Sequence, residues 1–257
     1  MRLTRLVLSV TAAVLLFGAN NSQAQPSSVP GNVTSPPSAE PPLSEEKRAD
    51  ILMARKMYRE AIEKYQAIEP QTAVIANKTG IAYHQMMQLD RAKKHYERSI
   101  KMDRRYAEAI NNVGTVHYAR KSFRRAVSFY KRALKITPNS ASIHSNLGTA
   151  EFARKRYKEA VEAYQRALSL DSDIFEHRST YGTILQERTV EEKAKFHYYL
   201  AKTYAQAGYK DRALQYLRKA LEEGFKDKQK MAEEPDFAAF RESPEFQELL
   251  TLQPRVL

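Results

Sequence analysis

The sequence predicts an all-α protein, a solenoid of stacked antiparallel helix pairs, and two observations lead to this fold class. First, three segments repeat one spacing, in which a glycine is followed by an alanine twelve residues later and by a tyrosine four residues after that. The three sets are Gly80/Ala92/Tyr96, Gly114/Ala126/Tyr130 and Gly148/Ala160/Tyr164. Second, the alanines lie 34 residues apart, and a fixed period of this size is typical of small helical units that pack only on their neighbours.

Residues 1–24 have the three parts of a secretory signal peptide. Arg2 and Arg5 supply the basic start, residues 6–18 are a mostly apolar run, and Ser22-Gln23-Ala24 is a cleavage site of small residues. As a helix this run would be about 20 Å long, which is short of the roughly 30 Å hydrocarbon core of a bilayer. We therefore expect an exported protein, either periplasmic or secreted. The alternative is that the segment stays uncleaved as an anchor.

Residues 25–43 are expected to form a disordered linker. They hold six of the chain's 11 prolines and no aromatic residue, so they cannot bury enough apolar surface to offset the entropy of ordering. The chain also has no cysteine, so disulfides cannot contribute to its stability.

The helical array is expected to cover residues 44–223. Its units are assigned to about 44–72, 73–106, 107–140, 141–174 and 194–227. In each complete unit the glycine and the alanine allow two helices to cross closely, and the tyrosine one turn further fills the gap beside them.

The conserved spacing within these units resembles the tetratricopeptide repeat family. The unit at 107–140 carries this resemblance with Ile110, Val113, Gly114, Ala126, Tyr130, Ala133 and Pro138, and the late unit with Leu200, Ala201, Tyr204, Ala213 and Ala220. The resemblance implies a right-handed superhelix in which the first helix of each unit lines a concave groove. It also implies a role in binding proteins or peptides.

The late unit is out of step with the others. Ala160 and Ala213 lie 53 residues apart, which is one period of 34 plus 19 residues. A new unit begins near Phe175, where the 34-residue period places it, and is interrupted after Glu187. We therefore expect the first helix of a unit over 175–187 and a long helix over about 190–207. The insertion, 175–193, is either a structural addition or an element that closes one end of the groove and selects ligands.

The tail, residues 224–257, loses the period and is expected to form a helical cap. Pro235-Asp236-Phe237 and Ser243-Pro244-Glu245-Phe246 each have the composition of a helix start. A terminal unit must cover the last apolar face of the stack, and the phenylalanines of this tail are suited to that role.

The resemblance also places candidate partner-binding residues on the groove side of the first helices. They are Asn77, Lys78, His84, Asn111, Asn112, Tyr118, Asn146, Phe152, Tyr198 and Lys202. Asn112 and Asn146 recur 34 residues apart, and stacked amides can both donate to and accept from an extended peptide backbone. The alternative interpretation is that asparagine at this position serves local packing.

The formal net charge of +12 is concentrated in one part of the chain. Residues 91–135 hold 14 lysines and arginines against three acids, and most of these bases fall on second helices and turns. This pattern indicates either a solvated face or a surface that docks on an anionic membrane or wall polymer. A nucleic acid is not expected as a partner, because the groove helices are not basic and an exported protein meets little nucleic acid.

Nothing in the sequence indicates an enzyme. The six histidines are scattered, no HExxH or cysteine cluster is present, and no glycine-rich phosphate loop or nucleophile elbow occurs. We expect no catalytic residue, no metal site and no cofactor. The expected function is a non-catalytic protein- or peptide-binding scaffold that acts through its groove. The alternative is a surface-associated protein that docks through its basic convex face, and homo-oligomerisation is a third hypothesis.

Overall fold

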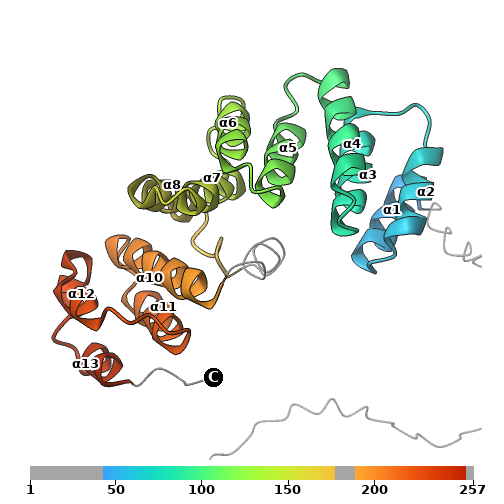
Figure 1. The fold of residues 1–257 in the computed structure, drawn as a ribbon. Helices are drawn as coiled ribbons and strands as arrows, with labels where there is room; N and C mark the ends of the chain where they lie inside the picture. Colours follow the sequence, from blue (N-terminus) through green and yellow to red (C-terminus); the bar gives the residue numbers. More distant parts are fainter. Residues whose placement is uncertain (1–42, 177–188, 253–257) are drawn as a thin grey trace, which may run out of the picture. The chain divides into compact units, whose positions relative to one another are not determined.

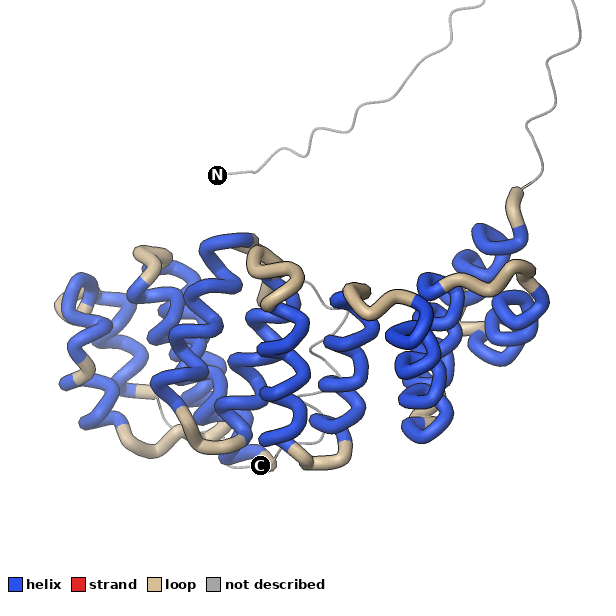
Figure 2. Tube along the Cα trace, turned by 90° about the horizontal axis from the view of Figure 1, so that it is seen from above, coloured by secondary structure: helices blue, strands red, loops and turns tan. Residues whose placement is uncertain are grey.

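The computed structural model describes residues 43–176 and 189–252 of the 257-residue chain. Within these ranges every regular element is a helix (Figure 2). The signal peptide, nearly all of the linker and most of the helix expected over 175–187 lie outside the described residues.

The described helices form pairs joined by short turns, and each pair packs on the next (Figure 1). The pairs are α1 (Glu45–Ala54) with α2 (Tyr58–Ala67), α3 (Ala73–Gln85) with α4 (Leu89–Met102), α5 (Ala107–Ala119) with α6 (Phe123–Leu134), α7 (Ala141–Ala153) with α8 (Tyr157–Leu170), and α10 (Val190–Gln206) with α11 (Lys210–Glu222). The tail adds α12 (Lys228–Glu233), the 3-10 helix η1 (Pro235–Phe240) and α13 (Pro244–Thr251). The predicted fold class, an all-α solenoid of helix pairs, is confirmed.

Each pair has a first helix and a second helix, and the first helices lie closer together. The first helix α3 packs directly against α5, and α5 packs against α7, whereas no comparable packing joins the second helices α4, α6 and α8 in the described residues. Helices on the inner side of a curved stack approach one another more closely than those on its outer side. The first helices of this segment therefore lie on the inner side.

Local capping fixes where several helices begin. The Ser44 hydroxyl accepts a hydrogen bond from the Lys47 amide, and Thr72 does the same for Ile75. Helix α10 begins with a capping box, in which Thr189 and Glu192 satisfy each other's backbone amides. Four of the turns between paired helices contain a residue in the left-handed region, with φ between 56° and 62°; these residues are Lys56, Met87, Lys121 and Lys155.

The repeat glycines lie against tyrosine rings. A Cβ atom on Gly80 would lie 2.6 Å from the Tyr96 ring, and one on Gly148 would lie 2.5 Å from the Tyr164 ring. The repeat spacing predicts each glycine against the alanine of the second helix, with the tyrosine filling the gap beside them. In the structure the ring itself is the tightest neighbour, so the tyrosine is what requires the glycine.

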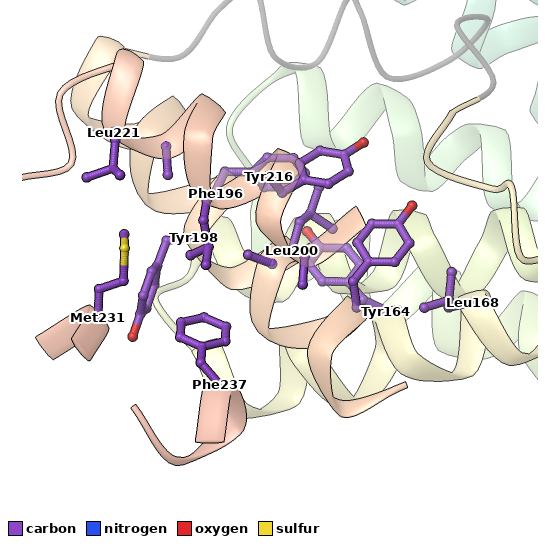
Figure 3. Close-up of a cluster of buried hydrophobic side chains, with 14 of the residues drawn as sticks. Tyr164, Leu168, Phe196, Tyr198, Leu200, Tyr216, Leu221, Met231 and Phe237 are labelled. Carbon is purple, nitrogen blue, oxygen red and sulfur yellow. The ribbon is translucent and has the colours of Figure 1, made fainter. Parts of the chain in front are cut away.

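The tail contributes to the largest apolar core. Met231, Phe237 and Phe246 are fully buried, and they join a cluster that also includes Tyr198 and Leu221 of the last helix pair (Figure 3). Burial of such side chains contributes about 1.5–3 kcal/mol each, which is enough to hold a short segment without repeat character on the array.

Among the described helices, none combines the length and the apolar character that crossing a bilayer requires.

Candidate functional site

A ladder of polar side chains links four first helices on the inner side of the array. Its links run from Lys78 Nζ to Glu46 Oε1 at 2.8 Å, from Asn112 Nδ2 to Asn77 Oδ1 at 2.9 Å and from Asn146 Nδ2 to Asn111 Oδ1 at 3.1 Å. Asn112 and Asn146 each lie two residues before a repeat glycine, and their acceptors lie three residues before the glycine of the preceding unit. In the units of α3, α5 and α7, one position thus bonds to a neighbouring position of the unit before it.

Asn111 joins two of these links into a continuous chain. Its Nδ2 donates to Asn112 Oδ1 at 3.2 Å, while its own Oδ1 accepts from Asn146. An asparagine amide has two N–H groups and two lone pairs on oxygen, so these bonds leave Asn111 and Asn112 with one N–H each. Both side chains are half-buried, and they therefore keep a polar edge toward solvent.

The positive charge of Lys78 is balanced by two acids of α1, the first helix of the array. Its Nζ lies 2.7 and 2.8 Å from the two carboxylate oxygens of Asp50, in addition to its bond to Glu46. Burial alone would lower the pKa of Lys78, but these hydrogen bonds outweigh it and raise the pKa. Burial of Asp50 acts to raise the pKa of that carboxyl, and hydrogen bonds from Lys78 and Tyr65 hold it below its usual value. Lys78 is thus a charged link of the ladder.

His84 is held as a neutral side chain. Its Nδ1 lies 3.4 Å from the hydroxyl of Tyr96, and burial lowers the pKa of the imidazole. A histidine in this state contributes hydrogen bonding without charge near neutral pH.

At the C-terminal end of the array, the tail covers part of α10, which is the first helix of the last pair. The Lys202 Nζ lies 2.9 Å from Glu234 and 3.2 Å from Asp236, and the Tyr198 hydroxyl donates to Glu234 at 2.7 Å. The ring of Tyr198 lies between Met231 and Phe237 in Figure 3. Two of the predicted partner-binding residues, Tyr198 and Lys202, therefore contact the chain's own tail.

Four of the predicted partner-binding residues are packing residues in this structure. Asn77 and Tyr198 are 1% exposed, and Asn146 and Phe152 are 5% exposed, so these side chains offer almost no surface. The other six, Lys78, His84, Asn111, Asn112, Tyr118 and Lys202, are half-buried, and their binding of a partner stays a prediction.

Sequence reasoning did not find a hollow at the turns that follow α5 and α7. It has a volume of about 500 Å³, and its lining includes Tyr118, Lys121, Phe123, Phe152, Lys155, Tyr157 and Lys195. A neighbouring hollow of about 580 Å³ shares Lys121 and Phe123 with it and adds Arg124, Arg125, Arg154 and Arg156. The sequence signal is the recurrence of bases at 120–125 and 154–156. The first group belongs to the predicted outward-facing charge of residues 91–135, and the second group is not part of that prediction.

No group of three or more histidine, cysteine or acidic residues that could hold a metal ion occurs within 43–176 and 189–252. What these residues do present is a row of linked helices with polar and basic surfaces, which is the kind of surface that repeat proteins use for binding.

Comparison with protein-family models shows which family the helix pairs belong to. Models described as tetratricopeptide repeat match residues 77–141, 141–174 and 194–223. The chain is therefore a tetratricopeptide repeat protein, and this membership supports a role as a protein-binding scaffold. A comparison with curated proteins found no match.

Several solved structures are similar to part of this chain. A crystal structure of MamA is 19% identical, covers 68% of this chain and 93% of its own, and has a TM-score of 0.47. MamA from Desulfovibrio magneticus RS-1 is 17% identical, with coverages of 69% and 92% and a TM-score of 0.48. YrrB, described as a TPR protein with an unusual peptide-binding site, is 17% identical, with coverages of 70% and 84% and a TM-score of 0.44. Similarities of this size say nothing about what the present chain binds.

Proposed function

We propose that this protein is a non-catalytic scaffold that binds a protein or peptide segment along the inner side of its array. The observation that carries the proposal is the asparagine ladder, which fixes the first helices in register and still leaves part of its amide edge half-exposed. A pre-organised row of donors and acceptors binds an extended backbone with little loss of entropy on the protein side.

Helix α5 carries a row of polar side chains that could contact such a partner. Asn111, Thr115 and Tyr118 follow one another at spacings of four and three residues, so they lie on one face of the helix. All three are half-buried, and the exposed Glu108 continues the row toward the helix start. This combination of amide, hydroxyl and phenol is suited to a polar backbone that carries small or aromatic side chains.

The test is a pair of blocking substitutions that leave the ladder intact. Glu108→Arg and Ser142→Arg place bulky side chains at exposed, equivalent positions of α5 and α7, which the family resemblance puts in the groove. The matched control is Glu162→Arg with Ser128→Arg, the same two changes at exposed positions of the second helices α8 and α6.

Affinity capture from the organism's own envelope extract compares the two variants with the wild type. The proposal predicts that some proteins of the extract are captured by both the wild type and the control, and that the Glu108→Arg/Ser142→Arg variant does not capture them. Equal capture by all three proteins would reject the inner surface as the binding site.

Export is part of the proposal and rests on residues 1–24 alone. The expected result is a mature chain that begins near Gln25, recovered from the periplasm or the medium. N-terminal sequencing of the natural protein decides it, and an intact Met1 in a cytoplasmic fraction would contradict it.

A second candidate is docking of the basic second helices on an anionic membrane or wall polymer. Arg98, Lys101 and Arg132 are exposed on α4 and α6, and none of them makes an ion pair among the described residues. Binding to phosphatidylglycerol vesicles should then be strong at low salt and fall steeply as salt rises. No preference over phosphatidylcholine vesicles would eliminate this candidate.

A further inference from the structure

Helix α10 carries a strip of lysines and tyrosines along one face. Lys195, Tyr198, Tyr199 and Lys202 follow one another at i, i+3, i+4 and i+7, which is the spacing of neighbours on a helix surface. The Lys202 Nζ lies 5.8 Å from the centre of the Tyr199 ring, and the Lys195 Nζ lies 4.3 Å from that of Tyr157 on α8. Cations and aromatic rings therefore alternate along this face.

One end of the strip holds an acidic, aromatic segment of the chain itself. Glu234 accepts from both Lys202 and the Tyr198 hydroxyl, and Asp236 lies 3.2 Å from Lys202. The ring of Phe237 meets the ring of Tyr198 edge to face, with centres 6.0 Å apart. This contact shows which chemistry the strip accepts, namely carboxylates on its lysines and an aromatic ring on its tyrosines.

The other end of the strip opens into the hollow of about 500 Å³, which we name the turn hollow. Tyr157 in its wall stacks on Tyr199 with ring centres 4.7 Å apart, and Phe152 lies edge-on to Tyr157 at 5.3 Å. The exposed Lys121 and Lys155 also line it, from the turns after α5 and α7. Neither lysine makes an ion pair within the described part of the chain.

Three lysines and two acids line the turn hollow, so its own net charge is slightly positive. Its acids are Glu191 and Glu192, and the Glu192 carboxylate accepts from the Thr189 amide at the start of α10. The adjoining hollow holds four arginines and no acid; they are Arg124, Arg125, Arg154 and Arg156. Arg154 is paired with Glu151 and Arg156 with Glu159, so Arg124 and Arg125 contribute the uncompensated charge. A field of this sign attracts an acidic partner and repels a basic one.

We propose that the turn hollow binds an acidic peptide segment with an aromatic side chain, in a partner protein. Its aromatic ring would lie against the half-buried Tyr157, and its carboxylates would pair with Lys121, Lys155 and Lys195. The chemistry matches that of residues 234–237 at the other end of the strip. The proposal rests on the scaffold function above, but it concerns a surface at the turns, separate from the blocking positions on α5 and α7.

The test uses a fluorescein-labelled peptide with the sequence of residues 232–240, Ala-Glu-Glu-Pro-Asp-Phe-Ala-Ala-Phe. Its binding to the mature chain is measured by fluorescence anisotropy at low and high salt. Lys121→Glu with Lys155→Glu should weaken binding by about tenfold or more, because two attractions become repulsions. Arg55→Glu with Arg59→Glu makes the same charge change at exposed positions elsewhere and should leave the affinity within about twofold.

Two altered peptides test the two halves of the recognition. Replacing the acids by Gln and Asn, or both phenylalanines by serine, should each weaken binding by about tenfold. The proposal is overturned if either altered peptide binds as tightly as the original, or if the Lys121/Lys155 variant binds normally. The second result would place the peptide at the tail site.

Anionic vesicles separate a peptide from a lipid partner. If phosphatidylglycerol vesicles bind through Lys121 and Lys155 while the peptide does not, the surface docks lipid and the proposal fails. The Glu108→Arg/Ser142→Arg variant should bind the peptide normally, so failure of the groove and failure of the turn hollow give different results.

Discussion

The contact between the repeat glycines and tyrosines gives the sharpest stability prediction, and Gly114 is the position to test. A Cβ atom there would lie 2.7 and 2.9 Å from two atoms of the Tyr130 ring and 3.2 Å from Phe129 Cβ. Tyr130 is 1% exposed, so its ring has nowhere to move. Overpacking costs about 1–3 kcal/mol, and contacts below 3.0 Å with a buried ring place this one in the upper part of that range, about 2–3 kcal/mol. Replacing a helical glycine by alanine returns about 1 kcal/mol of helix propensity. Gly114→Ala should therefore lower the free energy of unfolding by about 1–2 kcal/mol.

A double-mutant cycle with Tyr130→Ala isolates this contact. Tyr130→Ala alone should destabilise strongly, because it removes a buried aromatic ring. In that background Gly114→Ala should become neutral or stabilising, which gives a coupling energy of about 1–3 kcal/mol between the two sites. Urea unfolding followed by far-UV circular dichroism measures all four proteins. If Gly114→Ala is as stable as the wild type, or if its effect is the same without the ring, the reasoning is refuted.

Three further predictions concern the turns, the ladder and the tail. Lys56 has a φ of 62°, so Lys56→Gly should raise the free energy of unfolding by up to about 1 kcal/mol, as read from thermal melts; a lower melting temperature would contradict this. Asn112→Ala leaves the buried Asn77 oxygen without its donor and should cost about 1–3 kcal/mol in urea unfolding, whereas Gln66→Ala at an exposed site should cost almost nothing. Burial acts to raise the pKa of Glu234, but hydrogen bonds from Lys202 and Tyr198 hold it below its ordinary 4.5. The stability from this group is complete above that pH and is lost as the pH falls through the folded pKa. The hydrogen-exchange protection factors of residues 228–240, which are corrected for the intrinsic pH dependence of amide exchange, should therefore fall on acidification. In Glu234→Gln this fall should be smaller, and equal profiles would count against the contact.

The fold class could be predicted from the sequence because it depends on local, repeated chemistry. Gly80, Gly114 and Gly148 each recur with an alanine and a tyrosine at fixed distances, and such a period allows few folds. What the period does not show is which atoms meet. The tyrosine ring on the glycine depends on the crossing of two helices, which spacing alone leaves open.

The candidate site was only partly predictable. Asn112 and Asn146 were found because they recur, but their bonding partners, Asn77 and Asn111, lie one position away in the preceding unit. That offset comes from how neighbouring helices are rotated against each other, and no single unit encodes it. The same reason hides the donor role of Lys78, which bonds to acids 28 and 32 residues earlier.

A helical cap could be predicted for the tail, but its polar contacts and the turn hollow could not, because these contacts follow no period. Glu234 reaches Tyr198 across 36 residues, in a segment without repeat character. The turn hollow combines residues from 118 to 195, on both sides of the insertion, and only the structure brings them together. Both features lie where the regular array gives way to irregular sequence.

Site-specific photo-crosslinking tests most directly whether the first helices form the surface that binds a partner. A photoreactive phenylalanine analogue is introduced singly at positions 108 and 142 on the first helices and at 128 and 162 on the second helices, all of which are exposed. The account predicts that, in the organism's own envelope, the same partner protein is crosslinked from 108 and 142 and not from 128 or 162. Crosslinks to one protein from 128 and 162 alone would contradict it.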